Sequence, residues 1–157
     1  MKALVIYDTY FGNTEKIAQA IGEALKNKGE AKVVNVTQTG AADFNGVDLL
    51  IIGSPTRAFS ATKSINSFIK KLDKNKYSDL QIAVFDTRAD ITTVDSKFLE
   101  FMEKRAGYAT DSMLKLLQKQ GMQVADDTEG FFVDESEGPL KDGETDRAAA
   151  WAIELVK

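Results

Sequence analysis

The sequence contains no cysteine and no histidine, and these absences exclude several kinds of chemistry. Without thiolate or imidazole groups the chain cannot build a Cys/His zinc site or an iron–sulfur cluster. It also cannot supply a cysteine nucleophile or a Ser-His-Asp triad. Any redox reaction at this protein must therefore be carried out by a bound cofactor.

Proline and long apolar runs are scarce as well. Two prolines among 157 residues, with 43% apolar and 28% charged residues, are typical of a globular chain. The length predicts a single domain over residues 1–157. No run approaches the roughly 20 apolar residues that span a bilayer, and the apolar stretch after Lys2 is shorter than that of a signal peptide. We therefore expect a cytoplasmic protein that does not bind membranes.

The charge balance is mildly acidic, with 24 acidic and 20 basic side chains and a net charge of −4. Nucleic-acid-binding domains usually carry a basic patch and a high isoelectric point, so this balance disfavours a nucleic acid as partner. It suits a protein whose partners present positive surfaces.

Short apolar runs alternate with helical patterns along the chain. Several runs are almost uninterrupted, which is typical of strands covered on both faces. The five runs are Ala3–Tyr7, Lys32–Val36, Leu49–Gly53, Ile82–Phe85 and Val124–Val133. The helical stripes, which follow every run but the second, are Ile17/Ala18/Ile21/Leu25, Ile65/Phe68/Ile69/Leu72, Met113/Leu116/Leu117 and Ala149/Ala152/Ile153/Val156. Such alternation predicts an α/β fold, a three-layer, doubly wound, five-stranded parallel sheet with about five helices.

In doubly wound sheets, ligands bind beyond the carboxyl ends of the strands, so the loops after the first, third and fourth runs are the candidate site. The first of these loops, Thr9–Thr14, contains no charged residue and leads directly into a predicted helix. Free backbone N–H groups and the helix dipole can hold a phosphate there, and Gly12 allows close approach. The alternative is a plain N-cap, in which Asn13 or Thr14 only satisfies the helix's own amides.

Other phosphate-binding signatures are missing from the sequence. No G-x-G-x-x-G follows a strand and no G-x-x-x-x-G-K-[ST] occurs, which disfavours nicotinamide Rossmann domains and P-loop NTPases. The third run ends in Gly53-Ser54 and lacks the phosphorylatable aspartate that a receiver domain needs at this point.

Three segments resemble the flavodoxin family. Thr9–Thr14 is similar to the flavodoxin phosphate loop T-x-[TS]-G-N-T, with Phe11 in place of a hydroxyl residue. Gly53–Phe59 is similar to the family's G-[ST]-P-T loop. Near the end, Gly138-Pro139-Leu140 and Trp151-Ala152 resemble the corresponding parts of short-chain flavodoxins. The similarity extends over nearly the whole chain.

This resemblance implies a single flavodoxin-like domain that binds FMN and shuttles electrons between a reductase and an acceptor, as a monomer or weak dimer and without a metal or catalytic side chain. The residues expected to hold FMN are Thr9, Tyr10, Phe11, Gly12, Asn13, Thr14, Pro55, Thr56, Arg57, Ala58, Phe59, Asp86, Thr87 and Arg88. Two alternatives stay open: an NAD(P)H-dependent FMN quinone reductase, and a domain that has lost FMN and acts only in binding.

Aromatic side chains are expected to cover the two faces of the flavin ring. Phe59 is the candidate for one face of the ring. For the other face the fourth run offers no aromatic neighbour, which leaves Phe98, Phe101 and Tyr108, with Tyr108 favoured because the first two lie at helical spacing and suit a core. Trp151 is expected to pack against the sheet.

Glycine is absent between Gly53 and Gly107, where the loop after the third run would face the flavin. Turning the peptide at Arg57-Ala58 would therefore cost roughly 1 kcal/mol or more. We expect half-reduced FMN to be less stable here than in relatives with glycine. Arg57 and Arg88 lead to a further hypothesis, that at least one of them favours the reduced, anionic flavin or anchors an acidic partner.

Overall fold

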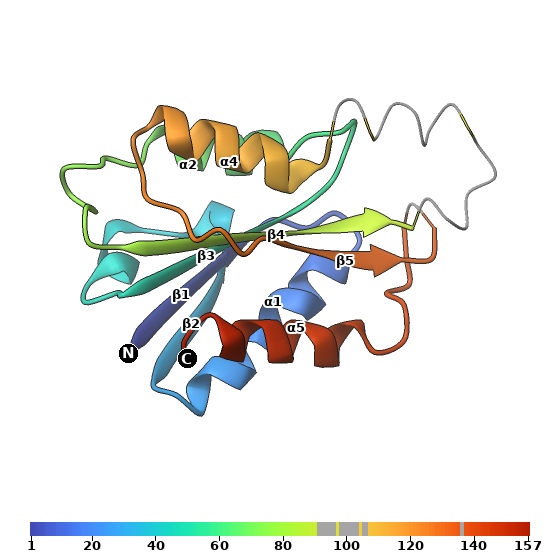
Figure 1. The fold of residues 1–157 in the computed structure, drawn as a ribbon, viewed down its shortest axis with the longest axis horizontal. Coiled ribbons are helices and arrows are strands. Elements are labelled where there is room, and N and C mark those ends of the chain that lie inside the picture. Colours follow the sequence, from blue (N-terminus) through green and yellow to red (C-terminus); the bar gives the residue numbers. More distant parts are fainter. Residues whose placement is uncertain (91–96, 98–103, 105–106, 136) are drawn as a thin grey trace.

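The computed structural model describes residues 1–90, 97, 104, 107–135 and 137–157. Five strands form one sheet: β1 (Lys2–Tyr7), β2 (Glu30–Asn35), β3 (Leu49–Pro55), β4 (Gln81–Ala89) and β5 (Glu129–Val133). All neighbours pair in parallel, in the order β2-β1-β3-β4-β5 (Figure 1). The predicted fold class is confirmed. Because the strand order reverses beside β1, the carboxyl ends of β1 and β3 flank the crevice where ligands bind in such sheets.

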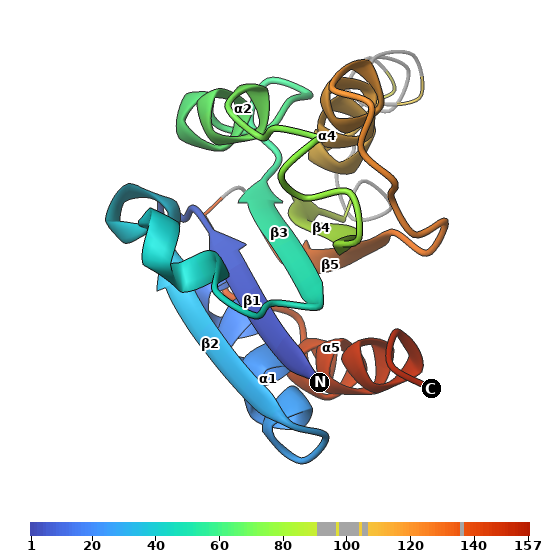
Figure 2. The same ribbon diagram turned by 90° about the vertical axis from the view of Figure 1, so that its left-hand side faces the viewer.

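Helices cover both faces of the sheet and give the three predicted layers (Figure 2). The helices α1 (Asn13–Lys26) and α5 (Glu144–Glu154) lie on one face, and α2 (Lys63–Lys70) and α4 (Ala109–Lys119) lie on the other. Between β2 and β3 the chain forms only short 3₁₀ turns, at Val36–Gln38 and Ala41–Phe44. No helix in these described segments has both the length and the apolar character needed to cross a membrane.

The two hydrophobic cores follow from the alternation of side chains along the strands. In β1, Val5 points to the α1/α5 side and Leu4 to the α2/α4 side, and both are fully buried. Trp151 packs edge-on against Phe85 and Phe131, with ring centroids 6.2 and 6.1 Å apart. This confirms the expected core position of Trp151.

Two predicted elements differ in detail from the structure. The buried residues of α5 are Glu144, Ala148, Trp151 and Ala152, so the predicted stripe is right for Ala152, and for Val156 just beyond the helix, which packs against the core, but missed Ala148 and Trp151. The large indole determines this orientation because it buries the most area. The last strand starts at Glu129, later than predicted, and Val124 only forms an isolated bridge with Ile82.

Candidate functional site

The loops after β1 and β3 and the carboxyl end of β4 meet around a cleft of about 440 Å³ at the carboxyl edge of the sheet. All of the residues predicted to hold a cofactor line this cleft except Gly12 and Asp86. Ala89 and Val133, which were not predicted, complete its wall. The sequence motifs that are far apart in the chain therefore form one concave site.

The first loop leaves the start of α1 open. Gly12 adopts a left-handed conformation with φ of 88° as the residue before the helix, and no side chain caps the helix. Thr9 closes the loop, since its Oγ1 accepts a hydrogen bond of 3.0 Å from the Gly12 N–H. Within the described residues, the N–H groups of Asn13, Thr14 and Glu15 have no acceptor. The plain N-cap interpretation is wrong, and the helix presents three free donors.

Two side chains of the first loop, Asn13 and Thr14, form hydrogen bonds that hold the loop against neighbouring segments. Asn13 Nδ2 donates to the Glu137 carbonyl at 2.9 Å. Thr14 Oγ1 and Thr87 Oγ1 share a buried hydrogen bond of 2.7 Å. Gly138 has φ of 110°, and a Cβ there would lie 2.7 Å from Asn13 Nδ2. The segment after β5 and the end of β4 thus position the amide-rich loop.

The second loop ends β3 in a tight and strained turn. Arg57 and Ser60 exchange backbone hydrogen bonds of 2.9 and 3.0 Å around Ala58 and Phe59. These two central residues have φ of 47° and 63°, values that residues other than glycine rarely adopt. Phe59 lines the cleft, as expected. Strain of this kind is often found at binding loops.

The substitution Ala58→Gly tests this strain. Glycine enters the left-handed region without steric cost, so we expect the free energy of unfolding to rise by about 1 kcal/mol. Chemical denaturation of the cofactor-free protein measures the change. Ala61→Gly, at a buried position outside the turn, should lower stability instead. A loss of stability in Ala58→Gly would contradict the strained turn.

Arg57 forms an exposed rim with the two aromatic residues of the first loop. Its guanidinium carbon lies 5.2 Å from the ring centroid of Tyr10 and 5.4 Å from that of Phe11. The two rings are 57% and 47% exposed. Cation–π contact thus brings together the loops after β1 and β3 across the mouth of the cleft.

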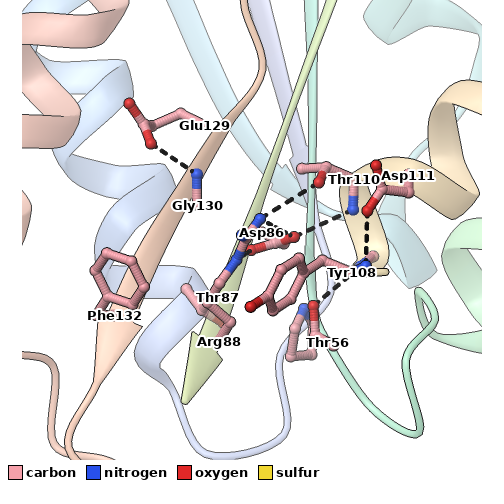
Figure 3. A network of polar contacts seen from close by, with 12 residues as sticks. Thr56, Asp86, Thr87, Arg88, Tyr108, Thr110, Asp111, Glu129, Gly130 and Phe132 are labelled. Carbon is pink, nitrogen blue, oxygen red and sulfur yellow. Dashed lines mark hydrogen bonds and ion pairs between the residues drawn. The ribbon is translucent and has the colours of Figure 1, made fainter. Parts of the chain in front are cut away.

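Near the carboxyl end of β4, Arg88 belongs to a mostly buried polar network (Figure 3). Its Nε and Nη2 donate to the two carboxylate oxygens of Asp86 at 2.7 and 2.8 Å. The Thr110 N–H donates to Asp86 Oδ2 at 3.1 Å, and the Arg88 guanidinium stacks 3.5 Å from the Tyr108 ring centroid. This network ties the start of α4 to β4.

Burial and pairing oppose each other in this network. Burial raises the pKa of the Asp86 carboxyl above its ordinary value, and Arg88 and Thr110 offset only part of that rise. Burial lowers the pKa of Arg88, but the hydrogen bonds and charge of Asp86 outweigh it and raise that pKa overall. Each member of the pair therefore stabilises the charged form of the other.

Three predictions made from the sequence concern Asp86, Tyr108 and the pair Phe98 and Phe101. The Asp86 carboxylate is fully buried and lies behind the cleft wall rather than in it. Tyr108 stacks on Arg88 and does not line the cleft. Phe98 and Phe101 lie outside the described residues. The cover of the second flavin face is not assigned to any of these aromatic residues.

The lining of the cleft fits a phosphorylated, partly apolar ligand. None of the lining residues carries a carboxylate, whereas Arg57 and Arg88 are cationic. A Cβ at Gly12 would meet no atom within 4 Å, which leaves open space at the free amides of α1. Such amides at a helix N-terminus bind phosphate without a basic residue.

Comparison with known proteins agrees with this geometry. Residues 4–125 match the family model described as the flavodoxin domain. A flavodoxin of Maridesulfovibrio salexigens is 30% identical over 132 residues, which are 81% of this chain and 83% of that protein.

Solved structures show the same fold. A flavodoxin from the domain Archaea superposes with a TM-score of 0.70 at 18% identity, over 99% of this chain and 96% of the other. The Fusobacterium nucleatum flavodoxin bound to flavin mononucleotide gives a TM-score of 0.68 at 19% identity, also over 99% and 96%.

Proposed function

The chain belongs to the flavodoxin family, and from this premise we propose that its cleft holds FMN through the residues described above. The protein is an FMN-binding electron carrier that passes electrons between redox partners. The observation that carries the site assignment is the set of three free amides at the start of α1.

The phosphate is assigned to the loop Thr9–Thr14. The N–H groups of Asn13, Thr14 and Glu15 point out of the first helical turn, where no acceptor among the described residues occupies them. Unpaired N–H groups and the positive end of the helix dipole attract negative charge, so an anionic ligand at this corner is favoured. The hydrogen bond from the Gly12 N–H to Thr9 Oγ1 holds the loop, and the absence of a side chain at Gly12 leaves space for the ligand.

The flavin ring is assigned to the space between the loop after β3 and the carboxyl end of β4. Pro55, Thr56, Arg57, Ala58 and Phe59 would border it on one side, and Thr87 and Arg88 on the other. FMN supplies the redox chemistry when bound, and the chain's residues bind it, orient it and shape its electrostatic surroundings. Asp86 acts indirectly, because it holds Arg88 in place.

We place the protein in the cytoplasm, as a single domain over residues 1–157 that acts as a monomer or weak dimer. A reductase and an acceptor protein are the partners, and the net charge of −4 suits docking on positively charged surfaces.

Titration of the purified apoprotein with FMN and, in parallel, with riboflavin tests the site. Riboflavin lacks only the phosphate, so we expect FMN to bind at one site per chain and riboflavin to bind at least tenfold more weakly, a difference of about 1.4 kcal/mol. Quenching of flavin fluorescence reports both affinities. Thr14→Val removes the hydrogen bond that holds the loop and should weaken FMN more than riboflavin.

The outcomes separate the candidate functions. Equal affinities for FMN and riboflavin would contradict the phosphate assignment. Absence of binding would favour a domain that has lost its cofactor. Rapid steady-state reduction of quinone by NADPH with the loaded protein alone would favour a reductase over a carrier.

A further inference from the structure

Arg57 and Arg88 both line the cleft, but their charges are compensated to different degrees. Arg88 donates two hydrogen bonds to the Asp86 carboxylate, at 2.7 and 2.8 Å. This carboxylate is fully buried, and the Arg88 side chain is 16% exposed. Two opposite unit charges held this close act on a third charge as a dipole, whose influence declines faster with distance than that of a single charge.

The Arg88 guanidinium is also fixed on both of its faces. The Tyr108 ring lies on one face, with its centroid 3.5 Å from the guanidinium carbon (Figure 3). On the other side lies the backbone of Gly130, where a Cβ would overlap the guanidinium. Arg88 therefore cannot swing away from Asp86 toward a ligand without breaking the network.

Arg57, in contrast, has no acidic partner. Among the residues that the structure describes, no carboxylate lies within ion-pair distance of it. Its guanidinium rests over Tyr10 and Phe11 at the mouth of the cleft. The aromatic rings restrict its position but leave its charge uncompensated.

We propose that Arg57 is the residue that makes the cleft bind reduced FMN more tightly relative to oxidised FMN. Arg88 does not contribute to this preference, because Asp86 compensates its charge. This rests on the proposed function, since it requires FMN in the cleft. Reduced FMN carries an additional negative charge on its ring, and an uncompensated cation at the cleft mouth attracts that charge. Arg57 then tightens binding of the reduced form more than that of the oxidised form.

The measurable quantity is the dissociation constant of oxidised FMN divided by that of reduced FMN. By linkage, this ratio sets how far the midpoint potential of bound FMN differs from that of free FMN. An exposed charge pair contributes about 0.2–1 kcal/mol, so Arg57→Gln should lower the ratio by about 1.4- to fivefold. Arg57→Lys keeps the charge and should preserve the ratio.

Two further variants control for Arg88 and for net charge. The double variant Asp86→Asn/Arg88→Gln removes both charges of the buried pair; because Arg88 borders the flavin, both dissociation constants should change, but by the same factor, so that their ratio stays the same. Lys119→Gln removes one exposed lysine at the end of α4, which forms no ion pair with any described residue, and should also leave the ratio unchanged. Anaerobic titrations with oxidised and dithionite-reduced FMN give both constants, and thermal melts of each apoprotein report folding.

Each result has a defined meaning. A ratio that falls in Arg57→Gln, and not in Arg57→Lys or the double variant, supports the proposal. An unchanged ratio in Arg57→Gln, or a lowered ratio in the double variant, overturns it while FMN binding itself stands. Failure of the wild-type chain to bind oxidised or reduced FMN would instead remove the proposed function.

Discussion

Replacing Arg88 by glutamine is expected to lower the free energy of unfolding by about 3–5 kcal/mol. The substitution leaves the Asp86 carboxylate fully buried without its countercharge, and glutamine cannot reproduce the bidentate contact. The hydrogen bond from the Thr110 N–H is the main compensation left for the carboxylate. Urea denaturation of the apoprotein, with the slope checked for constancy, measures the loss.

The loss of stability in Arg88→Gln should depend on pH in a way that identifies the buried Asp86 carboxyl as its cause. Burial raises the pKa of Asp86, and without Arg88 nothing of comparable strength opposes that rise. The folded variant then holds the Asp86 proton more tightly than the unfolded chain does. Its stability deficit should be small below the ordinary pKa of aspartate, about 3.9, and grow as the pH rises through the raised value.

Two variants make this prediction specific to the buried pair. Arg57→Gln removes an exposed arginine that has no acidic partner in the described part of the chain, so the stability of this variant should change by no more than about 0.5 kcal/mol. Asp86→Asn/Arg88→Gln should recover most of the loss, because no buried charge remains. Equal losses in Arg88→Gln and Arg57→Gln would show that the pair does not stabilise the fold.

The sheet could be predicted from the sequence because its signals are local. Leu49–Ile52 is a continuous apolar run, and only a strand covered on both faces accounts for such a run in a chain of alternating elements. The loop Thr9–Thr14 is likewise a contiguous motif at a strand–helix junction. The orientation of α5 could not be read in the same way, since three adjacent alanines define no strong stripe and packing of Trp151 decides it.

The supporting contacts of the site were beyond sequence reasoning because they join distant segments. Asp86 and Arg88 are two residues apart on a strand and so predictably share a face. Their meeting with Tyr108 and Thr110 depends on where α4 begins. Asn13 and Glu137 are 124 positions apart, and nothing local to either one indicates the hydrogen bond between them.

That long-range contact leads to the second large effect, expected for Gly138→Ala. Gly138 has φ of 110°, and its Cβ would lie 2.7 Å from Asn13 Nδ2 and 2.9 Å from Asn13 Oδ1. The backbone conformation alone costs a non-glycine residue roughly 1–2 kcal/mol. The clash must also displace the Asn13 side chain from the Glu137 carbonyl, which disturbs the loop assigned to the FMN phosphate.

Gly143→Ala separates the clash from the backbone cost. Gly143 also has a positive φ, 83°, but a Cβ there would meet no atom within 4 Å. Both variants should lose stability in denaturation, whereas only Gly138→Ala should weaken FMN binding, by about tenfold for the loss of a well-placed hydrogen bond. Riboflavin affinity should fall less, since that ligand does not use the phosphate loop. If FMN binds the two variants equally well, the contact between Asn13 and the segment after β5 does not position the phosphate site, and the hydrogen bonds of Thr9 and Thr14 suffice to hold the loop.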